Sequence, residues 1–244
     1  MCTVSFIPLK NNDFIFTSNR DEALGRKTIL PKFYALNGIQ TWFPKDAVSG
    51  GTWIGISDKN RLVCLLNGGF ENHIKKEKYR QSRGKVVLDF LTVNDCQSHI
   101  KNYNFENIEP FTLLIVDWDQ DLKLTELVWD GENAHFIDTT NLESKIWSSS
   151  TLYTNEMKKL RKNWFASFLE NEELTQETVL NFHQNYSVGD KNIDLQINRG
   201  ALKTVSITSV CKTDDNLEMT YLNLLENTTH KNTFSLQKPQ IINA

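Results

Sequence analysis

The first 22 residues of the chain read MCTVSFIPLKNNDFIFTSNRDE, numbered 1–22. Residues 2–9 and 14–17 are short runs rich in β-branched and aromatic side chains, so they predict two β-strands. The polar residues between them, 10–13, have the composition of a tight turn. The stretch therefore predicts an antiparallel hairpin, followed directly by the tetrapeptide Asn19-Arg20-Asp21-Glu22.

The predicted hairpin brings Cys2 close to Asp21. A two-residue loop on Asn11 and Asn12 pairs residues whose numbers sum to 23, and paired Cβ atoms lie about 4.5–5.5 Å apart. Asp21 is then expected to hold or orient the α-amine of Cys2. A register slip of one residue replaces Asp21 with a neighbour. Side-chain alternation along the strand also puts Arg20 on the opposite face.

Cys2 is a candidate nucleophile because of its position. Removal of Met1 would make it the first residue, and cysteine is small enough for that processing. The thiol is a strong nucleophile, and the α-amine, with a pKa near 8, can take its proton. By position alone, the more ordinary role of a cysteine is that of a small hydrophobic residue. Arg20 can stabilise a thiolate or a substrate carboxylate, whereas most such charged clusters are solvated turns.

Composition limits the class of protein. The chain has 244 residues, 27 basic and 30 acidic, with no basic stripe, so no nucleic-acid partner is predicted. The start lacks the features of a signal peptide, and no apolar run is long enough to span a bilayer. We expect a cytoplasmic protein with a single domain, residues 1–244, and leave its oligomeric state open. The spacing of its four cysteines and five histidines predicts no disulfide framework, metal site or cofactor.

The rest of the chain alternates runs of strands with pairs of helices. Apolar residues have helical spacing at 82–93, 94–103, 155–169 and 175–186, and strands are predicted at 53–56, 62–66, 111–118, 122–129, 134–138, 203–211, 217–225 and 232–236. Such segregated runs favour an α+β fold with antiparallel sheets, and no Gly-rich phosphate loop opens a helix. Two sheets packed face to face, with helix pairs outside, account for this order.

Two segments marked by glycine add further candidates. Residues 49–55 carry glycines where the backbone can approach a ligand or another strand closely. Asn67 ends an apolar strand just before Gly68 and Gly69. Its side chain can donate to a developing oxyanion, although an Asn-Gly pair is also a common turn.

Five short motifs resemble, in order and rough spacing, the NRDE family, also called transport-and-Golgi-organisation protein homologues. The motifs are Met1-Cys2-Thr3, Asn19-Arg20-Asp21-Glu22, Gly50-Gly51-Thr52-Trp53-Ile54-Gly55, Leu66-Asn67-Gly68 and Ser82-Arg83-Gly84. The match is dense over the first 91 residues and thinner to about residue 225. That family resembles in turn the choloylglycine hydrolase and penicillin V acylase branch of N-terminal-nucleophile (Ntn) hydrolases. In that branch the mature cysteine attacks an amide within a four-layer αββα sandwich.

The resemblance implies roles for individual residues. Cys2 is the nucleophile, Asp21 the partner of its amine, Arg20 a neighbour of the thiol and Asn67 an oxyanion donor. Further candidates for substrate binding or the oxyanion are Asn19, Ser149 and Arg199. The acylases place the arginine three residues before the aspartate and have an asparagine where this chain has Ser149. Both differences leave hydrolytic activity less certain to be retained than the fold. For the second, losing an oxyanion donor lowers the rate about 10²–10³-fold.

The leading prediction is an N-terminal cysteine amidohydrolase that cleaves a linear amide. The alternative is a carrier or chaperone that uses the same pocket for a hydrophobic ligand such as haem, since the family has been connected with haem handling. A third possibility is a scaffold without chemistry. The substrate is not predicted.

Overall fold

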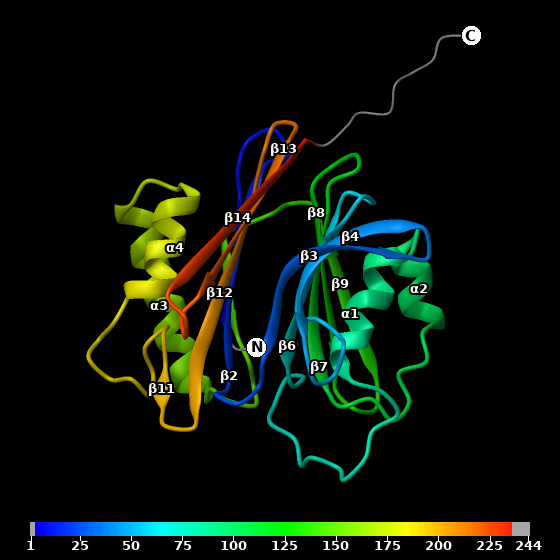
Figure 1. The fold of residues 1–244 in the computed structure, drawn as a ribbon, viewed down its shortest axis with the longest axis horizontal. Helices are drawn as coiled ribbons and strands as arrows, with labels where there is room; N and C mark the ends of the chain where they lie inside the picture. Colours follow the sequence, from blue (N-terminus) through cyan, green and yellow to red (C-terminus); the bar gives the residue numbers. More distant parts are fainter. Residues whose placement is uncertain (1–2, 236–244) are drawn as a thin grey trace.

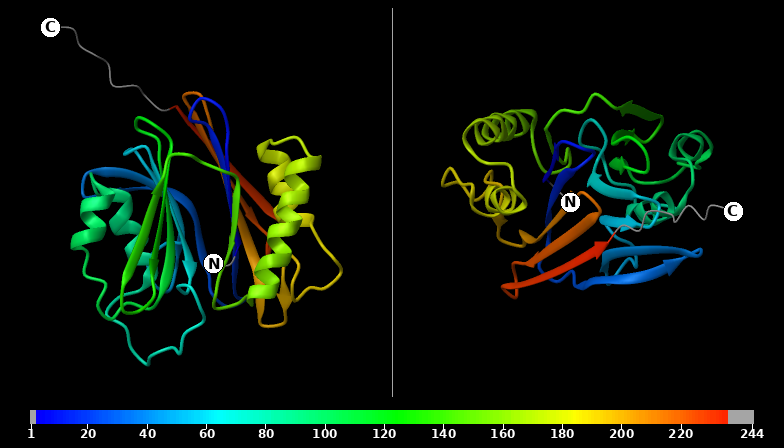
Figure 2. Two further views of the ribbon diagram at one scale, coloured as in Figure 1. Left: turned by 180° about the vertical axis from the view of Figure 1, so that it is seen from behind. Right: turned by 90° about the horizontal axis from the view of Figure 1, so that it is seen from above.

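The computed structural model describes residues 3–235, which form two β-sheets and four α-helices in four layers (Figure 1). Seen from above, helices, sheet, sheet and helices lie side by side (Figure 2). Every strand pair in both sheets is antiparallel. This arrangement confirms the predicted α+β class and the four-layer αββα architecture.

The first sheet has the strand order β10-β1-β2-β12-β13-β14, with β11 paired to β12, and the second runs β3-β4-β5-β6-β7-β8-β9. The first sheet consists of β1 (Thr3–Pro8), β2 (Phe14–Ala23), β10 (Lys145–Ser148), β11 (Asn198–Arg199), β12 (Leu202–Thr213), β13 (Asn216–Asn223) and β14 (Thr228–Ser235). The second consists of β3 (Thr28–Leu36), β4 (Ile39–Asp46), β5 (Ile54–Ser57), β6 (Arg61–Asn67), β7 (Phe111–Asp117), β8 (Lys123–Trp129) and β9 (Ala134–Thr139).

The helices cover the outer faces of the two sheets. The second sheet is covered by α1 (Arg83–Thr92) and α2 (Cys96–Asn102), and the first by α3 (Asn155–Asn171) and α4 (Gln176–Asn185). The four predicted helices appear within a few residues of their predicted bounds. No helix among residues 3–235 is long and apolar enough to cross a bilayer.

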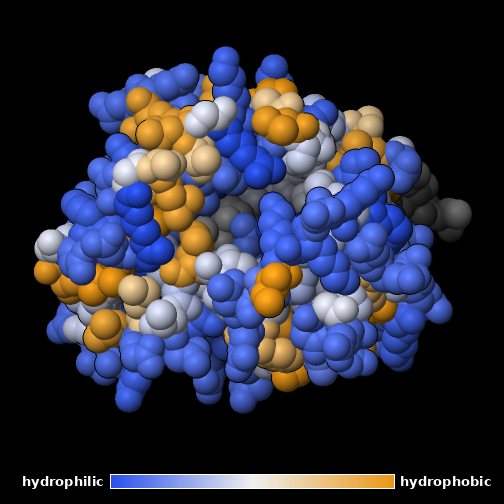
Figure 3. Space-filling model, turned by 90° about the horizontal axis from the view of Figure 1, so that it is seen from below, coloured by the Kyte–Doolittle hydropathy of each residue, from blue (hydrophilic) through white to orange (hydrophobic). Residues whose placement is uncertain are grey.

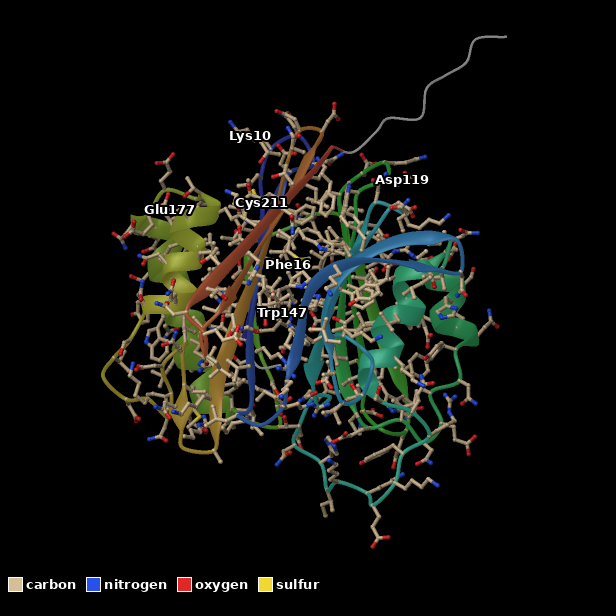
Figure 4. All side chains as sticks on the ribbon, in the orientation of Figure 1. Lys10, Phe16, Asp119, Trp147, Glu177 and Cys211 are labelled. Carbon is tan, nitrogen blue, oxygen red and sulfur yellow. The ribbon has the colours of Figure 1, made fainter. Side chains whose placement is uncertain are left out.

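Alternation along the strands divides the core into layers. Val4, Phe6 and Phe16 point between the sheets, whereas Ile7 and Ile15 point to the helices. Figure 4 shows Phe16 and Trp147 in the space between the two sheets. Each sheet thus buries both faces, which explains why its central strands are rich in apolar residues.

The structure has strands that the sequence pattern did not predict. β3 and β4 form a hairpin at the edge of the second sheet, and β10 and β11 add short strands to the first. β3 lacks a clear alternation because none of its residues is buried and its register shifts between Ile29 and Lys32. β2 continues through the tetrapeptide that was predicted to follow it, because β1 and β12 pair with it on either side. The last predicted strand, 232–236, appears as β14, and residue 236 lies outside the described residues.

The register of the β1–β2 hairpin is a correction. Paired residue numbers sum to 22, so Thr3 lies opposite Asn19. The amide of Leu9 donates to the Asp13 carbonyl at 2.8 Å, which leaves three residues in the loop. The last two, Asn11 and Asn12, have left-handed φ values of 60° and 61°. This register does not support the predicted pairing of position 2 with position 21. Cys2 itself lies outside the described residues.

Candidate active site

Asp21 is a buried carboxylate with both oxygens hydrogen-bonded. It lies near the end of β2 on the face that points to the helices, and its residue is 3% exposed. The Tyr153 hydroxyl donates to Oδ2 at 2.6 Å, and the Thr204 hydroxyl donates to Oδ1 at 2.6 Å. The two donors come from the β10–α3 connection and from β12. The carboxylate is therefore fixed in one orientation, with lone pairs left for further donors.

Arg20 points the other way, toward the second sheet, as side-chain alternation predicts. Its guanidinium donates to Asp46 Oδ2 at 2.9 Å and to Thr28 Oγ1 at 3.0 Å. It also lies over the Trp53 ring, 4.3 Å from the ring centre. Burial lowers the pKa of Arg20, and the Glu22 and Asp46 carboxylates offset part of that effect. Arg20 thus joins the two sheets.

The partner carboxylate of this contact stays ionised. Burial favours the neutral form of Asp46. The Ser49 amide and the guanidinium groups of Arg26 and Arg20 outweigh burial, so the pKa of Asp46 lies below its usual range. Arg26 Nε donates to the same Oδ2 atom at 2.6 Å. Glu22 Oε2 lies 3.8 Å from Arg20 and 3.6 Å from Arg26, so two cations and two carboxylates form a charge-balanced cluster at one end of the sheets.

Asn67 and Arg20 line one cavity of about 220 Å³. Asn67 is the last residue of β6, and Arg20 comes from the facing sheet, so the cavity lies between the sheets at the end where these strands finish. That end is hollowed near its centre in the space-filling view (Figure 3). The cavity is also lined by six charged residues: Glu22, Arg26, Asp46, Lys75, Arg83 and Glu109.

Ser149 lies behind Asn67 and supports its backbone. The Ser149 hydroxyl donates to the Asn67 carbonyl at 2.8 Å and is 2.9 Å from Thr151 Oγ1. Its single proton is thus directed at the backbone of Asn67. The structure brings these two predicted residues together, with Ser149 placed to position Asn67.

Asn19 and Arg199 are engaged elsewhere. The Asn19 amide donates to the carbonyls of His183 and Leu195 at 3.2 and 2.8 Å, and it is fully buried against α4. Arg199 donates to the Leu152 carbonyl at 3.1 Å, and its guanidinium lies 5.2 Å from the centre of the Tyr153 ring. In the described residues, Asn19 therefore holds a helix to the sheet, and Arg199 borders the surroundings of Asp21.

Three residues near Asp21 were missed by the sequence prediction. Tyr153 and Thr204 hold its carboxylate, and Arg161 packs on the Tyr153 ring. A signal for Arg161 was present. Positions 157, 161, 165 and 168 fall on one side of the predicted helix, and an arginine on that apolar stripe indicates a specific buried contact.

Comparisons with solved structures show the same fold. An N-acylethanolamine-hydrolyzing acid amidase ortholog from Caenorhabditis elegans has a TM-score of 0.56 at 12% identity and covers 85% of this chain and 92% of its own. Penicillin V acylase from Agrobacterium tumefaciens has a TM-score of 0.55 at 10% identity, covering 95% and 85%. A variant of conjugated bile acid hydrolase from Clostridium perfringens has a TM-score of 0.53 at 11% identity, covering 96% and 92%. The predicted Ntn-hydrolase fold is confirmed.

Curated relatives agree with the predicted family. The human Transport and Golgi organization protein 2 homolog is 29% identical over 130 residues, which cover 48% of this chain and 45% of the human protein. The mouse homolog is 30% identical over 115 residues, covering 43% and 41%. The match spans less than half the length of these relatives. A model of the family described as Transport and Golgi organisation 2 matches residues 1–197. The chain therefore belongs to the Transport and Golgi organisation 2 family.

Proposed function

We propose that this protein is an N-terminal cysteine amidohydrolase that cleaves a linear amide after removal of Met1. The observation that carries the proposal is the buried Asp21 carboxylate, which Tyr153 and Thr204 hold in one orientation. β2, which carries Asp21, pairs with β1, and β1 begins at the residue that follows Cys2. The substrate class is taken from the names of the structural neighbours, which are a conjugated bile acid hydrolase, a penicillin V acylase and an N-acylethanolamine-hydrolyzing acid amidase.

The proposed reaction has two stages. The Cys2 thiol attacks the amide carbonyl and passes its proton to the α-amine, which Asp21 holds. Asn67 and a backbone amide donate to the oxyanion. The carbon–nitrogen bond breaks, the α-ammonium protonates the leaving amine, and a thioester forms. Water then adds to the thioester, releasing a carboxylic acid and restoring the thiol.

The charged cavity beside Asn67 supports a substrate with a polar portion. Arg20 remains in the proposal as part of the cavity wall, where Asp46 holds its guanidinium. Trp53 and Leu65 are the apolar side chains among the lining residues. Such a lining gives the alternative, a carrier of a large hydrophobic ligand such as haem, no comparable support.

The test starts with the intact mass of the purified protein, which reports whether Met1 is removed. A panel of N-acyl-aminocoumarins with increasing acyl length then measures amide cleavage by fluorescence. We expect turnover in the wild type, none in Cys2→Ala, and a transient acyl group on the N-terminal peptide by mass spectrometry. Equal turnover in Cys2→Ala contradicts the mechanism. Retention of Met1 also contradicts it, because a blocked amine cannot act as the base. Stoichiometric haem binding without amide cleavage would favour the carrier.

A further inference from the structure

Two polar groups without partners belong to residues that line the cavity beside Asn67. The Trp53 indole N–H and the Ser82 hydroxyl are both buried, and neither has a hydrogen-bond partner among the described residues. Trp53 as a whole is 4% exposed. A buried polar group without a partner is destabilising, and native structures contain few of them. Two of them in the wall of one cavity call for a physical explanation.

The N-terminus of α1 lies in the same wall. Ser82 is its N-cap residue, and a serine hydroxyl in that position ordinarily accepts from an amide of the first turn. Within the described part of the chain, the Ser82 hydroxyl makes no such bond. The first turn also holds no acidic side chain, so the helix itself does not offset the partial positive charge of its N-terminus. Ser82, Arg83 and Gly84 all line the cavity.

Close backbone packing fixes this N-terminus in place. A Cβ on Gly51 would lie 2.5 Å from the Gly84 carbonyl carbon, and one on Gly84 would lie 2.9 Å from the Thr52 carbonyl oxygen. The Thr52 amide donates to the Gly84 carbonyl at 3.2 Å. Glycine permits this approach because it has no side chain. Two motifs of the sequence, residues 50–55 and 82–84, therefore meet at the cavity.

The groups gathered here are hydrogen-bond donors. An indole N–H, a guanidinium and the first amides of a helix can only donate, and a serine hydroxyl can donate as well. Arg83 donates to the Pro110 carbonyl at 3.1 Å, and its Nη2 lies 3.2 Å from Glu109 Oε2. A guanidinium has five N–H groups, so these two contacts leave Arg83 with donors for a ligand. The ligand that fits is one that accepts hydrogen bonds.

The charge of the lining indicates which acceptor fits best. Four basic side chains face three acidic ones, which leaves a net charge of +1: Arg20, Arg26, Lys75 and Arg83 against Glu22, Asp46 and Glu109. A carboxylate brings one negative charge and two acceptor oxygens, so it balances this lining. A phosphate dianion would leave an excess negative charge. The volume of about 220 Å³ also suits a small group.

We propose that this cavity is a carboxylate-binding site, formed by the N-terminus of α1 with Ser82, Arg83 and Trp53. Asn67, the proposed oxyanion donor, lines the same cavity, so a substrate that bears a carboxylate besides its amide can contact both. This link to the substrate rests on the proposed amide cleavage. The binding of a carboxylate does not depend on it.

Titration with propionate tests the site, followed by NMR on the indole N–H signals of the ¹⁵N-labelled full-length protein. Trp53→Phe assigns the Trp53 signal. We expect a saturable shift of that signal with propionate, a weaker effect of inorganic phosphate, and none with propionamide, which has the same shape and no charge. Trp118 is the internal control. Its indole N–H is also buried without a described partner, but its ring packs on Phe14 and does not line this cavity.

Variants of the first turn of α1 make the test specific. Arg83→Gln removes a charge and Ser82→Ala removes a hydroxyl, and each should weaken propionate binding about tenfold, the size expected for one hydrogen bond to a charged group. Lys85→Gln is the matched control, because Lys85 lies in the same turn, is exposed and does not line the cavity. It should bind propionate as the wild type does.

Equal binding of propionate and propionamide, or no shift of the Trp53 signal at about 50 mM propionate, overturns the proposal. If Arg83→Gln does not fold, the comparison of the two ligands and Ser82→Ala decide. Failure of the proposed function looks different. Propionate binding in a protein that cleaves no acyl-aminocoumarin supports the carboxylate site and rejects amide cleavage, whereas cleavage without propionate binding does the reverse.

Discussion

His183 is a fully buried imidazole that the fold keeps neutral. Its Nδ1 lies 2.7 Å from Asn19 Oδ1, which can only accept, so Nδ1 carries the proton. Nε2 is then the acceptor for the Ser5 hydroxyl, also at 2.7 Å. Burial, followed by the charge of Arg161, lowers the pKa of His183 to about 3. The resulting network ties α4 to β1 and β2.

This network predicts a loss of stability in acid. The pKa of His183 is lower in the folded chain than the ordinary 6.5, so the unfolded chain binds the proton more tightly. Its contribution to stability is present above about pH 6.5 and is lost as the pH falls toward about 3. Between pH 7 and pH 5 this group alone should remove about 2 kcal/mol from the free energy of unfolding. In His183→Gln the free energy of unfolding should fall by about 2 kcal/mol less between pH 7 and pH 5 than it does in the wild type. Urea unfolding at both pH values measures this change.

A matched control is His230→Gln, on the edge strand β14, which should keep the wild-type pH dependence. If the free energy of unfolding of His183→Gln still falls by the wild-type amount between pH 7 and pH 5, His183 does not set the acid sensitivity.

At the scale of elements, the end of β6 meets the β10–α3 connection at Gly68. Gly68 has a left-handed φ of 86°, and an added Cβ would overlap Ser150 Oγ and lie 3.0 Å from Thr151 Cγ2. The Ser150 hydroxyl donates to the Gly69 carbonyl at 2.6 Å, and the Ser149 hydroxyl donates to the Asn67 carbonyl. This close junction holds Asn67 at the cavity.

Gly68→Ala should therefore disturb both stability and the proposed site. We expect a loss of about 2–4 kcal/mol in the free energy of unfolding, from backbone strain plus the steric overlap. Gly200→Ala is the matched control, because Gly200 has a similar φ of 75° with open space around it. That variant should lose about 1 kcal/mol. Equal losses of stability in the two variants, measured by urea unfolding, would show that the residues around Gly68 accommodate an added methyl group at little energetic cost.

Sequence patterns predicted most elements but not their ends. The helices were predictable because a period of 3.6 residues is a local property. β3 was not, because this edge strand buries none of its residues and so shows weak alternation. The turn at Asn11 and Asn12 was recognised from its residues, but loop length depends on which φ values they take, and that choice shifted the register by one.

At the scale of the whole molecule, the two sheets are closed on one side by an aromatic cluster. Phe234 on β14 contacts Trp42 with ring centres 4.2 Å apart and Phe33 at 5.1 Å, both edge to face. Phe33 also stacks on Trp42, at 5.9 Å. The edge strands β14 and β3 run beside each other at the front of Figure 1. At the upper end, Asn12 in the β1–β2 loop adds a further contact between the sheets by donating to the Gln120 carbonyl at 2.8 Å.

Phe234→Ala should loosen the packing of one sheet on the other. We expect a loss of about 1–3 kcal/mol in the free energy of unfolding and a lower melting temperature, because the half-buried ring contributes area and two aromatic contacts. Phe70→Ala is the control. Phe70 is 57% exposed, and its ring contact is with His135 on β9 of the same sheet. That substitution should change stability by less than about 0.5 kcal/mol. Equal effects, followed by thermal unfolding, would argue against a role of the cluster in closing the sheets.

The sequence by itself determined the class of fold, the family and the identity of Asp21 and Asn67 as site candidates. Periodicity and short motifs are local, so they can be read along the chain. Only the tertiary structure decided the hairpin register and the burial of Arg161 beside Thr3. Those features depend on contacts between distant segments. Tyr153 and Thr204 reach Asp21 from 132 and 183 residues away, and packing of the layers, not local pattern, brings them there.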